Sequence, residues 1–385
     1  MKKSLLALSP TGVLVPTLAG QWAFDPADLP PALDNNVIIQ SFAEATLALG
    51  ELNGIGRTLP NPYLLIAPLQ AKEALTSSSM EGTFTTAAEL LLLDAGLDQP
   101  STTAEAREVR NYARALREAI DSLNRLPLCL RTIRDAHATL LGGLGRGRGG
   151  YAKAGEFRDQ QNWIGSRSIQ GARYIPPPPQ QARERMHALE SYIQREDRAA
   201  MPPLIDAALI HYQFETIHPF PDGNGRVGRI LIPLFLFERG TIRQPLLYLS
   251  PYLERHKDEY IDRMFEVSRR GDWAGWIAFF LRVVRDSCIE TIAVADRLLA
   301  LQAAYRARLS GAGRSSLPLA IVDHLFQHPI VSIPQLQERL GTTYVSAQKN
   351  LGIVEEAGIV EPVEGTSHPR YFRANDILNI ISDAT

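Results

Sequence analysis

Twelve consecutive residues, 218–229, carry more reactive groups than any other stretch of this chain. They read HPFPDGNGRVGR and contain an imidazole (His218), a carboxylate (Asp222), an amide (Asn224) and two guanidiniums (Arg226 and Arg229). His218 alone among them titrates near neutral pH, so it suits the role of a general base. Asp222 offers the hard oxygen ligands that Mg²⁺ prefers when it bridges a protein to substrate phosphates.

The surrounding residues predict that this segment is a loop between two helices. Residues 204–217 are mostly apolar or helix-forming, and residues 226–239 have the pattern of a buried helix. Gly223 and Gly225 let the backbone approach a ligand and turn its N–H groups toward it. Arg226 and Arg229 are three residues apart on the first helical turn, so they share a face and can bind phosphate oxygens. A polyphosphate at a helix N-terminus is the ligand that this arrangement favours.

On these residues, the segment resembles the HxFx(D/E)GNGRxxR signature of the Fic (Fido) family, and every specified position from His218 to Arg229 is matched. The resemblance implies a protein adenylyltransferase. Such a nucleotidyltransferase transfers AMP from ATP to a Ser, Thr or Tyr hydroxyl of a target protein, and AMPylation of the enzyme itself is a further implied reaction. The implied metal is Mg²⁺, held through Asp222.

The same resemblance assigns roles within the segment. His218 takes the proton of the attacking hydroxyl, while Asn224, Arg226 and the glycine N–H groups stabilise charge on the α-phosphoryl group and on the departing pyrophosphate. Many relatives have two tyrosines where this chain has Glu259 and Tyr260, and Tyr260 is the implied adenine contact. The implied ATP-binding residues are Glu81, His218, Gly223, Asn224, Gly225, Arg226, Val227, Gly228, Arg229 and Tyr260.

A second segment, SSSMEG at 77–82, resembles the (S/T)xxxE(G/N) inhibitory motif of many Fic proteins, with Ser77, Glu81 and Gly82 at the specified positions. In the family this glutamate reaches the second arginine of the signature, so the resemblance implies an ion pair between Glu81 and Arg229. A carboxylate on that guanidinium would keep ATP out of a productive pose. Because the motif precedes the core, the chain resembles the class whose inhibitory helix is N-terminal.

The bulk composition is that of an ordinary globular protein. The chain has 385 residues, is 45% hydrophobic and 21% charged, and carries a net charge of −2. This balance disfavours a protein devoted to binding nucleic acid or a membrane surface. No apolar run reaches the roughly 18 residues of a membrane span, so we expect a cytoplasmic protein. Cys129 and Cys288 lie in helical apolar patterns, which predicts buried thiols and no disulfide.

The hydrophobic periodicity predicts a mainly α fold with a C-terminal winged helix-turn-helix domain. The resemblance implies a Fic helical core with a short β-hairpin flap. We expect a Pro-rich, extended arm at 1–35, a helical region at 36–125 that contains the 77–82 motif, a core at 126–309 and the winged-helix domain at 317–385. One helix is predicted to begin at Pro62, capped by Asn61.

Residues 155–179 resemble the family's flap, an edge that aligns the protein substrate by strand addition. Residues 165–171 lie between short β-capable stretches, which predicts a hairpin. Four prolines at 176–179 must be extended. The glycine–arginine loop at 142–150 has the composition of a solvated turn.

The last part of the chain follows a linker at 310–316 and has three helical patterns, at 317–327, 332–340 and 344–356. A short β-wing is predicted around residues 359–360 and 371–372. From residue 314 to the end there are five Lys or Arg against eight Asp or Glu, and the third helix has only Lys349. DNA binding is therefore disfavoured, and contact with another protein is preferred.

Two other functions agree with the same residues. The Fic core could remove AMP from a modified protein, with Glu81 activating a water molecule. In a different class, the core would only sense ATP, and the C-terminal domain would act as an adaptor or regulator that binds DNA or protein. The sequence does not identify the target protein, and it does not distinguish a monomer from a homodimer.

Overall fold

The computed structural model describes residues 3–33, 37–58, 63–97, 102–144, 153–197, 201–310, 316–364, 366 and 369–382. The first half contains η1 (Lys3–Leu5), β1 (Gly12–Pro16), β2 (Trp22–Pro26), α1 (Ile39–Thr58), α2 (Tyr63–Ser79), α3 (Ala87–Asp94), α4 (Ala104–Ser122), α5 (Leu130–Leu141), η3 (Ile169–Gly171) and α6 (Pro179–Ile193). The second half contains α7 (Pro203–Ile217), α8 (Asn224–Glu238), α9 (Ser250–Arg255), α10 (Lys257–Arg270), α11 (Trp273–Leu309), α12 (Leu317–Gln327), β3 (Ile330–Ser332), α13 (Ile333–Arg339), α14 (Tyr344–Glu356), β4 (Glu361–Pro362), β5 (Tyr371–Arg373) and α15 (Asn375–Ser382). The predicted mainly α fold is confirmed.

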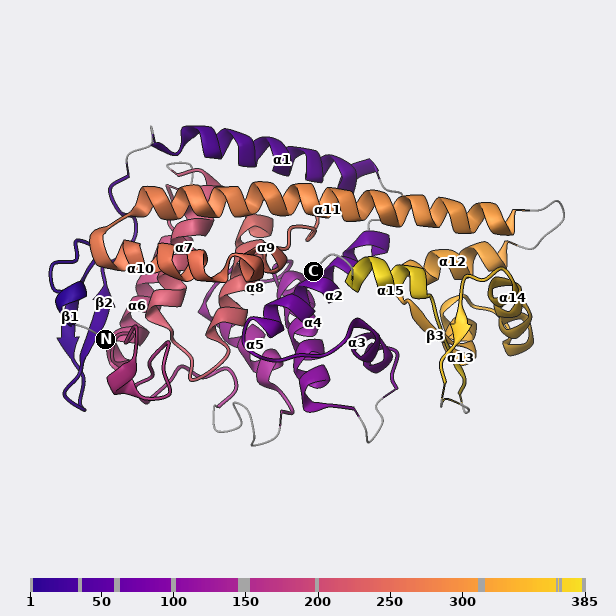
Figure 1. Ribbon diagram of the computed structural model, residues 1–385, viewed down its shortest axis with the longest axis horizontal. Coiled ribbons are helices and arrows are strands. Elements are labelled where there is room, and N and C mark those ends of the chain that lie inside the picture. The colour runs from indigo at the N-terminus through magenta and orange to yellow at the C-terminus, as the bar shows by residue number, and fades with distance from the viewer. Residues whose placement is uncertain are drawn as a thin grey trace.

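The 37-residue helix α11 runs along the length of the molecule, and α1 lies beside it (Figure 1). Its N-terminus is capped by Asp272, whose side chain accepts a hydrogen bond from the Gly275 N–H. Below α11, α7 and α8 form the centre of the core. Both have apolar residues on all faces and are almost wholly buried, as expected for helices surrounded by protein.

The N-terminal residues do not form the loose arm that their proline content predicted. β1 and β2 pair antiparallel from Gly12–Pro26 to Pro16–Trp22. Phe24 is fully buried against Leu6 and Tyr174, and its N–H donates to the Ile175 carbonyl across 2.9 Å. Proline is tolerated at these strand ends, because no hydrogen bond between the strands requires its missing N–H there. The hairpin therefore supports the flap segment from one side.

The flap segment is less regular than predicted. In place of a hairpin with two strands, Ile164 and Tyr174 form a single antiparallel bridge, and the residues between them contain the short helix η3. Gly165 lies there with a φ of 84°, a left-handed conformation that other residues rarely adopt.

The C-terminal region has the predicted three helices, and β5 coincides with the predicted wing strand. The sequence analysis missed β3 and α15. The strands form a sheet in the order β3-β5-β4, while α12 packs on α2 and α11, and α15 packs on α2, α3 and α11. One hydrophobic core includes side chains from Ile38 to Ile381, so the predicted regions 36–125, 126–309 and 317–385 share a core. The winged-helix interpretation stays a prediction.

Several sequence-based expectations fall outside the described residues. These are the Asn61 cap and Pro62 start of α2, residues 145–150 of the glycine–arginine loop and residues 311–315 of the linker. Among the described residues, Cys129 is partly buried and Cys288 is buried, and both are free thiols. No helix in the described ranges is long and apolar enough to cross a membrane.

The shared core can be tested at Leu325, a fully buried side chain of α12. Leu325→Ala should lower the free energy of unfolding by about 2–5 kcal/mol, because it leaves a cavity between α12 and its neighbours. Val345→Ala on α14, where the side chain is 73% exposed, is the matched control and should change it little. Chemical denaturation should show one transition for both variants. A separate early transition in Leu325→Ala would indicate an independent C-terminal core.

Candidate active site

The loop between α7 and α8 is shaped by two residues in the left-handed region. His218 ends α7 with a φ of 50° and a ψ of 60°, and it is the only non-glycine residue with a positive φ in the described part of the chain. Gly223 precedes α8 with a φ of 76°. A strained histidine persists only when its surroundings hold it in place, and such residues concentrate at functional sites.

Asn224 holds the loop from inside. Its side-chain oxygen accepts from the Phe220 N–H, and its amide group donates to the Phe220 carbonyl, both across 2.8 Å. Asn224 is buried, and both polar atoms of its side chain are engaged. In this structure Asn224 therefore shapes the loop, whereas the sequence analysis gave it a contact with the phosphoryl group.

His137, on α5, supports the same loop. Its ring stacks on Phe220 with centroids 3.8 Å apart. Its Nδ1 accepts from the Gly155 N–H, so its Nε2 carries the hydrogen and donates to the Asp222 carbonyl across 3.1 Å. Burial lowers the pKa of His137 to about 4, which agrees with a neutral ring.

Arg158 fixes the backbone of the histidine itself. This buried guanidinium donates from Nε to the His218 carbonyl across 2.9 Å and from Nη2 to the Pro177 carbonyl. The Arg158 N–H also donates to the Pro219 carbonyl. Arg158 comes from the segment that the sequence analysis assigned to the flap, so this segment also holds the loop.

The imidazole of His218 is oriented to act as a base. Its Nδ1 lies 3.3 Å from the Glu215 carbonyl, an acceptor that requires a hydrogen on Nδ1 and leaves Nε2 unprotonated. Burial, with the nearby charge of Arg158, lowers the pKa of His218 to about 4. His218 is therefore neutral at physiological pH.

His218 lines a pocket of about 280 Å³ whose lining contains both charged and apolar side chains. The charged residues are Glu81, Glu215, Arg229 and Lys257. The apolar and aromatic residues include Ile164, Tyr174, Tyr260, Ile261, Met264 and Phe265. A mixed lining of this kind can hold a ligand that combines an anionic group with a flat apolar one.

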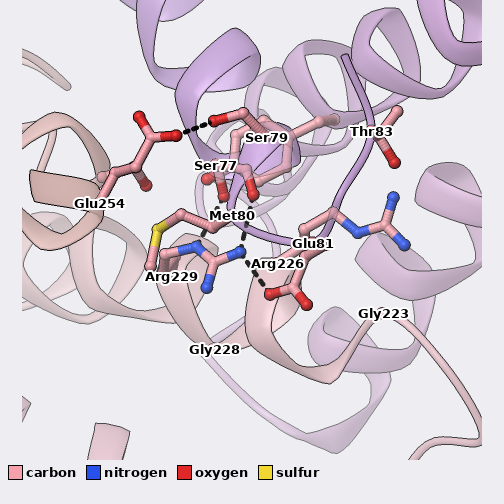
Figure 2. Close-up of polar contacts among 12 residues, drawn as sticks. Ser77, Ser79, Met80, Glu81, Thr83, Gly223, Arg226, Gly228, Arg229 and Glu254 are labelled. Carbon is pink, nitrogen blue, oxygen red and sulfur yellow. Dashed lines mark hydrogen bonds and ion pairs between the residues drawn. The ribbon is translucent and has the colours of Figure 1, made fainter. Parts of the chain in front are cut away.

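Arg229 brings the two sequence motifs together (Figure 2). Its Nε donates to the Ser77 hydroxyl across 2.7 Å, and its Nη2 donates to the Ser77 carbonyl and to Glu81 Oε1, each across 2.8 Å. Residues 148 positions apart thus form the ion pair that the resemblance implied. Arg229 is buried, so these contacts supply the partners that a buried guanidinium requires.

The Glu81 carboxylate lies at the N-terminus of α8. A Cβ atom on Gly225 would overlap Glu81 Oε1, so the missing side chain makes room for it. The first N–H groups of α8 have no capping side chain, and a helix N-terminus attracts anions. Partial burial favours the neutral acid, but the charge and hydrogen bond of Arg229 outweigh it and lower the pKa of Glu81. An ionised carboxylate therefore occupies the place suited to a phosphate.

The segment that carries Glu81 is held at its other contacts as well. The Ser79 hydroxyl donates to Glu254, and the Lys257 ammonium donates to the Met80 carbonyl. Gly82 has a φ of 81°, so the chain can turn away directly after Glu81. α9 and α10 thus hold the segment that carries Glu81 beside the pocket.

Arg226 has a carboxylate partner that the sequence analysis did not identify. Its Nη1 forms a buried ion pair with Glu108 of α4, and the Thr83 hydroxyl donates to the same Glu108 oxygen across 3.1 Å. Asp222 lies 3.7 Å from Arg226 Nη2. The Nε of Arg226 is buried with no partner among the described residues, so one donor remains for a ligand.

Tyr260 is on the wall of the pocket, where the sequence analysis placed it. Its hydroxyl lies 2.7 Å from His211 Nε2. His211 Nδ1 faces the Gly228 carbonyl and must donate to it, so Tyr260 donates its hydrogen to Nε2. Burial lowers the pKa of His211 to about 3, in agreement with a neutral ring. The Tyr260 ring thus has a fixed position.

Asp222 fits a magnesium site in which the substrate phosphates supply most of the other ligands. Its Oδ1 accepts from the Gly223 N–H across 2.6 Å, and its side chain is 46% exposed. Within the described ranges, no group of three His, Cys, Asp or Glu side chains is arranged to bind a metal ion. Mg²⁺ commonly uses one or two carboxylates and takes its remaining ligands from phosphates and water, so one accessible carboxylate is sufficient.

The predicted nucleotide contacts divide into two groups. The pocket is lined by Glu81, His218, Gly225, Arg229 and Tyr260. The residues of the predicted set outside this lining are Gly223, Asn224, Arg226, Val227 and Gly228. The sequence analysis missed Glu108, His137 and Arg158. They lie in ordinary helical or loop patterns, and only their distance to the loop reveals them.

Two family models match this chain. Residues 127–236 match the model of the Fic/DOC family, and residues 39–121 match that of the Fic/DOC family N-terminal region. Together the matches include α1 to α8, with both sequence motifs.

Among curated relatives, a protein adenylyltransferase Fic from Culex quinquefasciatus is 30% identical over 165 residues, which are 43% of this chain and 28% of that protein. A probable protein adenylyltransferase from Aquifex aeolicus is 34% identical over 98 residues, which are 26% of this chain and 28% of that protein. The chain thus matches less than a third of the length of these relatives.

Solved structures share the fold. A Fic family protein from Desulfovibrio desulfuricans G20 has a TM-score of 0.59 and 21% identity, with 90% of this chain and 98% of that chain covered. Fic-1 from C. elegans has a TM-score of 0.54 and 19% identity, with 68% of this chain and 74% of that chain covered.

The ion pair of Arg226 and Glu108 can be tested through stability. Glu108→Leu should lower the free energy of unfolding by about 3–5 kcal/mol, because it leaves a buried guanidinium without its main partner. The control is Asp135→Leu, which removes an ion pair with Arg131 whose side chains are both more than 70% exposed. That change should cost at most about 1 kcal/mol in urea denaturation. Equal losses in the two variants would contradict a stabilising role of the buried pair.

Proposed function

The chain belongs to the Fic/DOC family, and on this premise we propose that it is a protein adenylyltransferase held in a resting state by Glu81. The observation that carries the proposal is the contact of Glu81 with Arg229 at the N-terminus of α8, beside an unprotonated His218. Relatives named as protein adenylyltransferases support the reaction class.

In the proposed reaction, a Ser, Thr or Tyr hydroxyl of a protein attacks the α-phosphorus of ATP. A bond forms between the hydroxyl oxygen and phosphorus, the bond from phosphorus to the bridging oxygen breaks, and pyrophosphate leaves. The hydroxyl proton passes to Nε2 of His218, which is free because Nδ1 faces the Glu215 carbonyl. Positioning and electrostatic stabilisation supply most of the catalysis in such transfers.

The phosphates are held by groups that are already in place. The N–H groups at the start of α8 and the Arg229 guanidinium bind oxygens once Glu81 has left. Asp222 would hold Mg²⁺, which neutralises charge on the phosphates when bound. The apolar and aromatic residues of the pocket, including Tyr260, are suited to the adenine ring.

Glu81 explains why this arrangement is inactive at rest. Its carboxylate accepts a hydrogen bond from Arg229 and fills the space beside Gly225, and the phosphates of ATP require both this donor and this space. The same charge also repels phosphate. The Glu81 carboxylate and a phosphate of ATP therefore compete for the same hydrogen-bond donors.

We predict that Glu81→Gly raises AMP transfer to protein hydroxyls, including those of the enzyme, at least tenfold. The change removes the competing anion and frees Arg229, and the readout is incorporation of label from α-labelled ATP. The double variant Glu81→Gly with His218→Ala should fall by at least about 10²-fold, because it lacks the base. If Glu81→Gly is silent and the parent protein removes AMP from a modified target, Glu81 is catalytic and the reaction runs in the opposite direction.

The pH dependence follows from His218. Its pKa is lowered to about 4, so the unprotonated form persists well below the ordinary value for histidine, and activity should be lost only as pH falls toward that value. The kcat of Glu81→Gly at saturating ATP should therefore stay level from pH 7.5 to about 5.5. Circular dichroism at each pH controls for unfolding. A half-loss near pH 6.5 would show that His218 is not shielded as proposed.

A further inference from the structure

The backbone carbonyl of Glu215 faces His218 Nδ1, but the Glu215 side chain has no role in the reaction described above. Glu215 lies on α7, three residues before His218, and lines the same pocket. Its Oε1 is buried and has no hydrogen-bond partner in the described part of the chain. A buried polar atom without a partner costs free energy, so native proteins retain one mainly where a ligand or water completes it.

The absence of a side chain at Gly228 leaves room for the Glu215 carboxyl. A Cβ atom on Gly228 would overlap Glu215 Oε1. Neither residue belongs to the specified positions of the family signature, which leaves the position of Gly228 open. A helical glycine is costly unless something requires the missing side chain, and the Glu215 carboxyl supplies that requirement.

Charged and titratable groups face Glu215 from three other elements. Arg229 comes from α8, Glu81 from the turn after α2, and Lys257 and Tyr260 from α10, while His211 and His218 flank it on or next to its own helix. Burial raises the pKa of Glu215 to about 8, Arg229 opposes this rise and Glu81 adds to it. At neutral pH the group is mostly the neutral acid and can donate a hydrogen bond.

We propose that the Glu215 side chain is a nucleotide contact outside the family signature, and that it hydrogen-bonds an oxygen of the outer (β or γ) phosphates of ATP beside Arg229. This inference rests on the proposed function, because it requires that ATP occupies the pocket after Glu81 has left. An ionised carboxylate at this point would repel phosphate, whereas a neutral acid donates to it. Gly228 keeps the carboxyl beside α8, next to the arginine that holds the same phosphate.

The test compares two replacements of Glu215 in the Glu81→Gly protein. Glu215→Gln keeps the shape and retains a donor, and it imitates the neutral acid at every pH. Glu215→Leu keeps the approximate volume and removes both donor and acceptor. Binding of ATP with Mg²⁺ and binding of AMP are measured by calorimetry, and thermal unfolding confirms that each variant is folded.

We expect Glu215→Leu to weaken ATP binding by about tenfold, the effect of one lost hydrogen bond to a charged group, and to weaken AMP binding much less. Glu215→Gln should stay within about threefold of the Glu81→Gly protein, since it keeps the donor. The difference between ATP and AMP separates a contact with the outer phosphates from a contact with the ribose or base.

The pH dependence gives a readout that a packing role would not change. With glutamate at 215, ATP affinity should fall as the pH rises through the pKa of this group, because the neutral donor becomes a repelling anion. In Glu81→Gly this transition should lie below pH 8, since Glu81 contributes to the raised pKa. The Gln variant should show no such transition, and His218 does not titrate in this range.

Three results would overturn the inference. Unchanged ATP affinity in Glu215→Leu would show that the carboxyl is only packed against α8. Equal losses for ATP and AMP would place the contact away from the outer phosphates. If the Glu81→Gly protein with Glu215 intact binds no ATP, the proposed function fails and this inference fails with it, whereas tight ATP binding that is indifferent to Glu215 leaves the proposed function standing.

Discussion

A buried arginine must find hydrogen-bond acceptors, and much of the site depends on how Arg229 does so. In this structure its acceptors are the Ser77 hydroxyl and carbonyl and the Glu81 carboxylate, all from the end of α2 and the turn after it. These contacts join the first turns of α8 to a helix about 150 residues earlier in the chain. Since a phosphate could supply the same acceptors, the resting contact and the proposed nucleotide compete for one guanidinium.

The segment that carries Glu81, which would have to move in the proposed activation, is held at several points. Glu254 and Lys257 bind its end, and the Thr83 hydroxyl links the residues just after it to Glu108 and so to Arg226. Both signature arginines therefore have carboxylate partners from the N-terminal helical region. Further back, α2 is packed against α12 and α15 of the C-terminal region. α2 is thus part of the common core along most of its length.

The helices were largely predictable from the sequence because amphipathic or wholly apolar periodicity is a local signal. α7, α12 and α14 begin and end within a few residues of their predicted limits. The N-terminal hairpin, β3 and α15 were not predicted. The strands among these elements are short or end at proline. They are stabilised by residues distant in the sequence, such as Ile175, whose carbonyl accepts from the Phe24 N–H. A short strand has little intrinsic preference, so its existence depends on the neighbour that pairs with it.

The sequence by itself determined the chemistry available at the site: a histidine, a carboxylate, two arginines and glycines at a helix N-terminus, with a second motif ending in Glu81. Only the tertiary structure decided how these groups are used. It turned Asn224 inward to hold the loop, paired Arg226 with Glu108, and left Oε1 of Glu215 without a hydrogen-bond partner among the described residues. Burial and nearby charge move the pKa of His218 down and that of Glu215 up. The sequence states which groups are present and how they are spaced. Their hydrogen-bond partners and pKa values depend on segments that only the fold brings together, such as Glu81 and Arg229.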